Sequence, residues 1–263
     1  MPQPSMDFAV TVLPVLSGLR DILMPHWGNV EVLKEKGAGA HDIVTELDIA
    51  VEERTRTELA ELYPDIAFVG EEGGGDRTAD RLWLMDPIDG TGHYLRGLPF
   101  CTSMLAYIEA GQVRFSAIYD FVNDRVYWAE RGKGAYCNGD RLGVSNRKLR
   151  ESYVAWESNQ SEAANRELTQ LLRQETNLFN SINAGWEMAM VASGKLDARI
   201  CFEPYGKDYD FAPGSLLVEE AGGVVANVGT TTYDYRNTSF IAAGPTLYQE
   251  LTEGERSIFP ITR

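Results

Sequence analysis

The chain of 263 residues is 44% hydrophobic and 24% charged, an ordinary globular composition that excludes a disordered chain, a collagen-like fibre and a disulfide scaffold. Its 39 acidic and 24 basic residues give a net charge of -15, which repels phosphate backbones, so we expect no nucleic-acid partner. The cysteines Cys101, Cys137 and Cys201 lie far apart, which favours a reducing, cytoplasmic location over a disulfide framework or a cysteine zinc site.

The N-terminal segment predicts a helix that packs on a core. Residues 1–5 lack the positive charge of a targeting signal. The apolar stretch over residues 8–23 is interrupted by Pro14, Gly18 and Arg20 and is too short to span a bilayer, so we expect no membrane partner. Its apolar residues follow helical spacing and predict an amphipathic helix; they are Phe8, Val12, Val15, Leu16, Leu19 and Leu23.

Residues 42–63 predict a second helix that ends before Pro64, with Thr45 as a possible cap. Its expected buried side consists of Leu47, Ala50, Val51 and Leu62. Two four-residue apolar runs follow, at residues 66–69 and 82–85, and each is bounded by charge or glycine, which suits buried strands.

The rest of the chain first predicts a β-rich stretch and then alternating helices and strands. The predicted strands cover residues 103–108, 113–119, 125–129, 199–202, 224–228 and 240–243, with a hairpin signal at Asn138-Gly139. The predicted helices cover residues 162–173, 186–193 and 210–221, and a last helix begins after Pro245. Because there is no repeat or linker, we expect one mixed α+β domain over residues 1–263, with halves of about 1–147 and 148–263.

The first candidate site follows the second apolar run directly and reads Asp86-Pro87-Ile88-Asp89-Gly90-Thr91. Its two carboxylates are held on a stiff loop, because Pro87 fixes its own φ and restricts the residue before it. Gly90 permits a tight turn and a close approach to a ligand. A helical turn starting there would direct amides at the space between the carboxylates, which suits a divalent cation and a phosphate. The alternative is an aspartate that caps a turn.

Three further acidic motifs lie at predicted element ends. Glu71 follows the first apolar run in Gly-Glu-Glu, Asp210 opens a helix, and Asp48 shares a helical face with Thr45, three residues earlier. Each has an alternative interpretation: a solvated acidic loop, an N-cap aspartate and a capping box.

Taken together and in order, the four motifs resemble those of the inositol monophosphatase family of magnesium-dependent, lithium-sensitive sugar and polyol phosphatases. The family signatures D-x-V-T-x-x-D, G-E-E, W-x-x-D-P-I-D-G-T and W-D-x-A-A-G with E-A-G-G correspond to residues 42–48, 70–72, 83–91, 209–214 and 220–223. The resemblance spans about residues 36–225. It implies a layered αβαβα sandwich and, commonly, a homodimer.

The resemblance also implies roles for single residues. Glu71, Asp86 and the carbonyl of Ile88 would hold one Mg²⁺, and Asp86, Asp89 and Asp210 a second, with a third, weaker ion near Glu71 and Mn²⁺ as a possible replacement. The implied catalytic residues are Thr91, Asp48 and Glu71, with Thr91, oriented by Asp48, helping to activate a water. The implied substrate-binding residues are Asp89, Gly90, Thr91 and Ala184. Hard cations prefer such oxygen ligands.

Several positions depart from the family pattern. After Thr91, the sequence Gly92-His93-Tyr94 replaces T-N-F. Tyr209 stands in place of a tryptophan and Pro213 in place of an alanine. The segment from Phe179 to Ala184 (residues 179–184) replaces R-S-x-G-S-A. Cys201 aligns with the inositol-contacting glutamate, and Glu203 follows two residues later. His93 either contacts substrate or is an ordinary packed or solvated histidine.

The implied function is a Mg²⁺-dependent phosphomonoesterase that acts on a small polyol or sugar phosphate. A specificity for histidinol phosphate, fructose 1,6-bisphosphate or 3′-phosphoadenosine nucleotides remains open, as does a non-catalytic role. No EF-hand spacing supports a calcium module.

Overall fold

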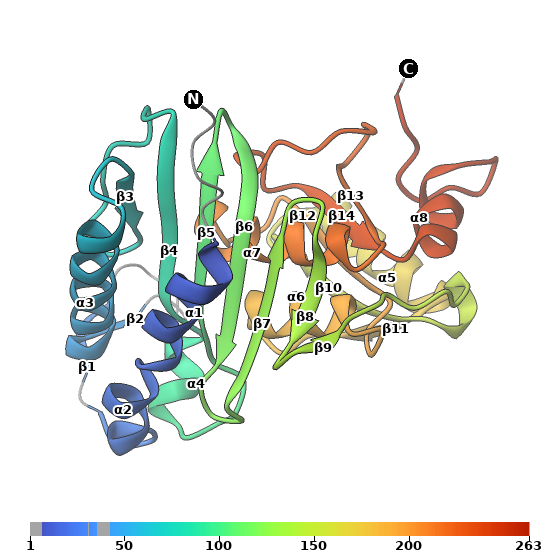
Figure 1. Cartoon of the computed structure of the whole chain (residues 1–263). Coiled ribbons are helices and arrows are strands. Elements are labelled where there is room, and N and C mark those ends of the chain that lie inside the picture. Colours follow the sequence, from blue (N-terminus) through green and yellow to red (C-terminus); the bar gives the residue numbers. More distant parts are fainter. Residues whose placement is uncertain (1–6, 31, 36–42, 263) are drawn as a thin grey trace, which may run out of the picture.

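The computed structural model describes residues 7–30, 32–35 and 43–262 and has five layers, in the order αβαβα (Figure 1). An outer layer with α1 (Phe8–Ser17) and α3 (Glu46–Leu62) covers a seven-stranded sheet. Two central helices, α6 (Ala184–Ala192) and α7 (Asp208–Glu220), separate it from a five-stranded sheet, which α5 (Ala163–Glu175) and α8 (Pro245–Thr252) cover on its far side. The predicted α+β class and layer order are confirmed.

The seven-stranded sheet runs in the order β3-β4-β5-β6-β7-β8-β9, with β3 and β4 parallel and all other neighbours antiparallel. Its side chains alternate between two cores, since Trp83 and Met85 face the outer helices whereas Leu82 and Leu84 face α6 and α7. The strands are β3 (Ala67–Gly70), β4 (Arg81–Asp89), β5 (Thr102–Glu109), β6 (Gln112–Asp120), β7 (Arg125–Glu130), β8 (Gly134–Cys137) and β9 (Asp140–Arg141). The predicted hairpin at Asn138-Gly139 joins β8 to β9, with φ of 49° and 92° at its two turn residues.

The five-stranded sheet has the order β11-β10-β12-β14-β13, in which β11, β10 and β12 are parallel. Its strands are β10 (Tyr153–Ser158), β11 (Asn177–Phe179), β12 (Ala198–Phe202), β13 (Val224–Asn227) and β14 (Phe240–Ala243). The last three match predicted strands, whereas β10 and β11 were not predicted. The smaller elements are β1 (Val32–Glu35), paired with β2 (Ile43–Thr45), and the short helices α2 (Arg20–Leu23), α4 (Thr91–Leu95), η1 (Met24–His26) and η2 (Leu149–Glu151).

Helix α7 lies between the two sheets and is buried over its middle, residues 211–218. A helix that is apolar on all sides fits such a central position. It packs closely on α6, since a Cβ on Gly214 would lie 2.5 Å from the Cβ of Met188. This layer brings Asp210 to the seven-stranded sheet.

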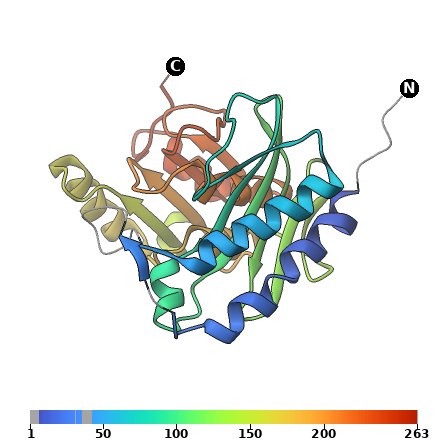
Figure 2. The same ribbon diagram turned by 90° about the vertical axis from the view of Figure 1, so that its left-hand side faces the viewer.

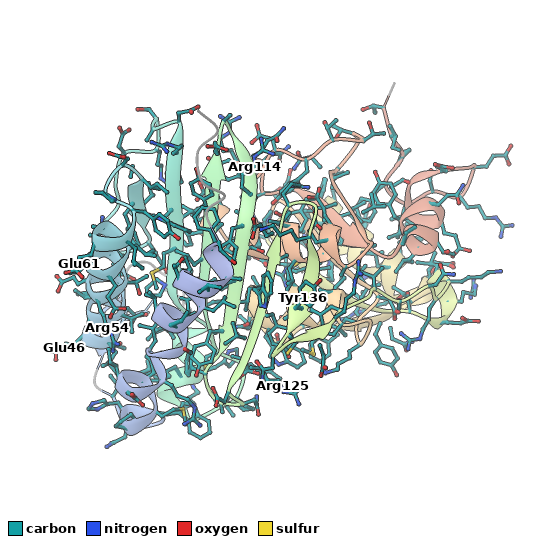
Figure 3. The ribbon with its side chains drawn as sticks, viewed as in Figure 1. Glu46, Arg54, Glu61, Arg114, Arg125 and Tyr136 are labelled. Carbon is teal, nitrogen blue, oxygen red and sulfur yellow. The ribbon has the colours of Figure 1, made fainter. Side chains whose placement is uncertain are left out.

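Helices α3 and α1 lie across the outer face of the seven-stranded sheet (Figure 2). Figure 3 shows Glu46 and Glu61 projecting from α3 on the side away from the sheet. The prediction of the buried face of α3 was half right: Val51 is buried and Leu47 is half-buried against the outer core, but Ala50 is exposed and Leu62 is 45% exposed. The helix is oriented by polar contacts that Asp48 and Glu52 make with the site. Its buried face therefore consists of Asp48, Val51, Glu52, Thr55 and Leu59.

The predicted start of the second helix was also wrong. Residues 36–42 lie outside the described part of the chain, but residues 43–45 form β2 and the helix begins at Glu46. Thr45 is its N-cap and has an extended backbone, with φ -116° and ψ 168°. Pairing with β1 therefore extends the chain up to the cap.

Residues 8–26 have a length and mean hydropathy, 1.4, that would allow a helix to cross a membrane. In the structure this stretch is α1, α2 and η1 rather than the single helix predicted over residues 8–23. The break follows Gly18, whose carbonyl accepts a 3.3 Å hydrogen bond from Arg54 Nη1 of α3. All six apolar residues predicted to pack are buried.

Candidate active site

A β-bulge in β4 brings Asp86 and Asp89 to the same side of the sheet. Residues three apart point to opposite faces of a regular strand. Here Asp86 pairs with Met104 and Asp89 with Thr102, so three steps on β4 match two on β5. The extra residue restores the same orientation. Ser103 Oγ donates a 2.7 Å hydrogen bond to the Pro87 carbonyl and fixes the bulge.

Glu71 reaches the same site from the neighbouring parallel strand. Gly70 pairs with Met85, and the Glu71 amide donates to the Met85 carbonyl over 3.1 Å. The register therefore sets Glu71 beside Asp86, and its charge helps to raise the pKa of that carboxyl group.

Glu52 of α3, which the sequence analysis missed, holds the loop that carries Glu71. Its side chain is 3% exposed, and its carboxylate accepts the amides of Glu72 (2.8 Å) and Gly73 (2.9 Å) and pairs with Arg56 (2.6 Å). A Cβ on Gly70 would lie 2.1 Å from this carboxylate carbon, so only glycine fits there. The available sequence signal was its spacing, since Glu52 lies four residues after Asp48 and therefore on the same face of the helix.

Asp210 enters from the first turn of α7. It is not an N-cap: α7 begins at Asp208, and the Lys207 amide donates to Asp210 Oδ2. One carboxylate oxygen each of Asp86, Asp89 and Asp210 lies within 4.8 Å of the other two. The structure therefore gathers three of the predicted acidic ligands into one cluster, with Glu71 next to it.

Burial and mutual repulsion perturb these acids. The pKa of Asp86 is raised well above its ordinary value by burial, then by Glu71, Asp89 and Asp210. Burial raises the pKa of Asp89 to about 7 against the hydrogen bond from the Gly185 amide and the charge of Arg199, and burial followed by Asp89 raises that of Asp210 to about 7. A cluster of carboxyl groups whose pKa values are raised in this way is typical of a functional site.

The cluster fits a hard divalent cation. All its donors are carboxylate oxygens, which Mg²⁺ and Mn²⁺ accept. Asp86 Oδ1 is buried and has no hydrogen-bond partner among the described residues, and a buried oxygen in that state is costly without a cation. The Ile88 carbonyl, a predicted ligand, lies 2.9 Å from Thr91 Oγ1.

Thr91 and Asp48 form a pair at the edge of the cluster. Thr91 Oγ1 lies 3.1 Å from Asp48 Oδ1. The other oxygen of Asp48 accepts the amide of Thr45 (2.8 Å) and its hydroxyl (2.5 Å), which completes the capping box. Asp48 therefore belongs to the capping box of α3 and also contacts Thr91. Burial raises its pKa to about 6, against the hydrogen bonds from Thr45.

Gly90 and the N-terminus of α6 support Asp89 from the other side. Gly90 has φ 82°, and a Cβ there would lie 2.6 Å from the Phe100 carbonyl oxygen. Asn183, the N-cap of α6, donates from Nδ2 to the Asp89 carbonyl (2.7 Å), and the Gly185 amide donates to Asp89 Oδ2 (2.6 Å). Ala184 lies between them and is buried.

The side of the site that departs from the family pattern contains Cys201 and Glu203. Cys201 is fully buried in the central core. Glu203 is exposed at the end of β12 and accepts a 3.0 Å hydrogen bond from Asn165 Nδ2. It lines a cavity of about 600 Å³ together with Asn159, Glu162, Ala164, Asn165, Phe202 and Pro204. His93 contacts the ring of Phe100, at a centroid distance of 6.1 Å.

This geometry defines a candidate divalent-cation site between two sheets, and comparisons with known proteins place the chain. Residues 8–258 match the model of the Inositol monophosphatase family, so the chain belongs to that family. It is 29% identical over 248 residues to the fructose-1,6-bisphosphatase/inositol-1-monophosphatase of Thermotoga maritima, with 94% of each chain covered. It is 34% identical over 230 residues to the Nus factor SuhB of Pseudomonas aeruginosa, covering 82% and 83%.

The solved structures agree. The inositol monophosphatase (IMPase) of Thermotoga maritima superimposes with a TM-score of 0.84 at 30% identity, over 94% of this chain and 95% of that one. Membership of the family supports a phosphatase hydrolase.

Proposed function

We propose that this protein is a Mg²⁺-dependent phosphomonoesterase that hydrolyses a small polyol or sugar phosphate. The observation that carries the proposal is the cluster of the buried Asp86 and Asp89 with the half-buried Asp210, in which one Asp86 oxygen has no hydrogen-bond partner among the described residues. Divalent ions held by these residues would neutralise the cluster, polarise the phosphate and lower the pKa of an attacking water.

The proposed metal ligands come from β4, from the residue after β3 and from the first turn of α7. Glu71, Asp86 and the Ile88 carbonyl would hold one ion, and Asp86, Asp89 and Asp210 the other. A third ion would bind more weakly near Glu71, and Mn²⁺ could occupy these sites in place of Mg²⁺. Glu71 is proposed as a catalytic residue together with Thr91 and Asp48, since it would hold an ion that the reacting groups also contact.

The pair of Thr91 and Asp48 would orient the attacking water. Above a pH of about 6, Asp48 would be ionised, and its Oδ1 would accept the hydrogen bond that the Thr91 hydroxyl donates. Thr91 Oγ1 then presents a lone pair to a water proton. The amides of Gly90 and Thr91, with Asp89 and Ala184, would bind the phosphate ester.

The assay that tests the proposal measures phosphate release with Mg²⁺ and with EDTA. The panel contains inositol phosphates, sugar phosphates including fructose 1,6-bisphosphate, histidinol phosphate and 3′-phosphoadenosine nucleotides, whose catalytic efficiencies rank the alternatives. Asp86→Asn is the matched control. No metal-dependent release from any compound would reject the proposal.

A non-catalytic role is the competing candidate, and the altered residues 179–184 favour it. A relative named as a Nus factor is also similar to this chain. An Asp86→Asn protein that kept its biological role would support this alternative. We further propose a cytoplasmic homodimer; sedimentation of the purified protein tests the dimer.

A further inference from the structure

A group of three charges, two of them buried and the third, Glu157, with a side chain that is 22% exposed, lies beside the carboxylate cluster. Arg199 of β12 forms ion pairs with Glu157 of β10 and Glu187 of α6. The side chains of Arg199 and Glu187 are 3% and 1% exposed. Because desolvation offsets most of the attraction in buried ion pairs, stability alone is a poor explanation for this group.

Glu187 holds one segment that contacts Asp89. Its Oε1 accepts the amide (2.6 Å) and the hydroxyl (2.9 Å) of Ser181. Ser181 begins the first arm, defined as residues 181–185. Within this arm Asn183 and Gly185 donate the two hydrogen bonds that hold Asp89.

Glu157 holds a second segment, which contacts Asp210. Its Oε1 accepts the amides of Tyr205 and Gly206, each over 3.1 Å. The next residue, Lys207, donates its amide to Asp210 Oδ2. We call residues 203–207 the second arm.

Both arms contain an unfavourable backbone conformation. Five non-glycine residues have positive φ in the part of the chain that the structure describes, and Ala110, Asp124 and Asn138 occupy hairpin turns. The other two are Ile182 (φ 57°) in the first arm and Glu203 (φ 48°) in the second. A β-branched residue rarely adopts this conformation, which persists only where neighbouring groups hold it.

We propose that Arg199 is a positioning residue that, through Glu187 and Glu157, holds both arms so that Asp89 and Asp210 face a shared divalent ion. The inference rests on the proposed metal-dependent function. In this role Arg199 acts through the two glutamates and not by contact with the substrate or the ion.

The test compares Arg199→Lys, Glu187→Gln and Glu157→Gln with the wild type. Mn²⁺ alone is titrated in a calorimeter, and the unfolding midpoint is measured without metal. Lysine cannot bridge two carboxylates in the planar geometry of arginine. We expect Mn²⁺ affinity to fall about 10–100-fold, as for other groups that orient metal ligands, and excess Mn²⁺ to restore part of the lost kcat.

The matched control is Asp197→Asn, which removes another buried carboxylate. Asp197 is 1% exposed and pairs with Arg147, and its other partners, Ser145 and Tyr153, lie outside both arms. We expect this variant to lose stability while keeping wild-type Mn²⁺ affinity.

Three outcomes are distinct. Wild-type Mn²⁺ affinity in folded Arg199→Lys and Glu187→Gln would overturn the inference while leaving the proposed function intact. Absence of Mn²⁺ and Mg²⁺ binding by the wild type would remove the proposed function itself. If Arg199→Lys does not fold, the nearly isosteric Glu187→Gln decides the result by the same titration.

Discussion

On the carboxylate side of the site, Asp86 and Asp89 lie in β4 and Glu71 follows the neighbouring β3, whereas the two arms are held by charges from β10, α6 and β12. Strand register and one bulge place the first group, so a short stretch of sequence determines its geometry. The arms depend on three residues that are far apart in the chain and meet only in the folded core. From this difference we expect substitutions on the carboxylate side to abolish phosphate release. Substitutions near the arms should change the metal affinity or the rate without abolishing the reaction.

The largest expected effect comes from Asp89→Asn. The amide keeps an acceptor for Gly185 but loses the charge that a cation needs, so kcat should fall by about 10³-fold. Without metal the variant should unfold at a higher temperature, because repulsion within the cluster decreases. Phosphate release and thermal unfolding measure both effects.

Asp120→Asn is the control for this experiment, since Asp120 is 2% exposed but bonds to Asn123, away from the cluster. A wild-type rate in Asp89→Asn would contradict the assignment of this residue.

Thr91→Ala should lower kcat by about 10²-fold while leaving metal affinity nearly unchanged, because the hydroxyl orients a water. Thr91→Ser keeps the hydroxyl and should retain most of the rate. Steady-state kinetics and a metal titration separate the two effects. Equal losses of rate and metal affinity in Thr91→Ala would indicate a structural role instead.

The pH dependence of metal binding follows from Asp89 and Asp210, whose pKa values of about 7 lie above the ordinary value. Metal must displace their protons, so below pH 7 the affinity for Mg²⁺ should fall about tenfold per pH unit for each proton released. Calorimetry in buffers of different ionisation enthalpy counts these protons. Affinity that is constant from pH 5.5 to 8 would be inconsistent with these raised values.

The metal-free protein should respond in the opposite direction. Between the ordinary pKa of 3.8 and about 7, these two groups hold protons in the folded state that the unfolded state has released. Their contribution to the free energy of unfolding is therefore present below pH 4 and is lost as pH rises through 7. Metal should restore it at pH 8.

A smaller effect is expected from Glu52→Gln. Both oxygens of Glu52 accept backbone amides, so a glutamine leaves the Glu72 or the Gly73 amide without its acceptor. The loop that carries Glu71 should loosen and metal affinity should fall by about tenfold. Exposed Glu53→Gln on the same helix is the control. Equal affinities in the two variants would show that Glu52 does not position Glu71.

The smallest effect should come from Glu203→Gln, at the end of β12. A change there should raise KM by only a few-fold, about 1 kcal/mol, and alter the ranking of substrates, with kcat and metal affinity retained. Steady-state kinetics on the phosphate panel measures this. A loss of kcat as large as that in Thr91→Ala would remove the distinction between the two sides.

The same contrast explains what the sequence could predict. The acidic motifs, the Thr45 cap and the Asn138-Gly139 hairpin are local patterns. The structure bears out the cap, the hairpin and the grouping of Asp86, Asp89 and Asp210. The roles of all the site residues stay predictions: the metal ligands Glu71, Asp86, Ile88, Asp89 and Asp210, and the catalytic and substrate-binding residues Thr91, Asp48, Gly90 and Ala184. The division of one domain near residue 147 also stays a prediction.

Other features could not be predicted from local patterns. The buried face of α3 follows Glu52, whose partners are backbone amides some 20 residues further along the chain. Strand β11 has only three residues and pairs with β10 across an intervening helix. The contacts of Arg199 join residues 157, 187 and 199, and no spacing rule connects these positions.

The most direct measurement is diffraction from a crystal soaked with Mn²⁺ and phosphate, recorded at the manganese absorption edge. The account predicts anomalous peaks bridged by Asp86 to Glu71 on one side and to Asp89 and Asp210 on the other, with a phosphate oxygen bound to them. Ordered phosphate with no manganese between these carboxylates, in a crystal whose site is open to solvent, would contradict it.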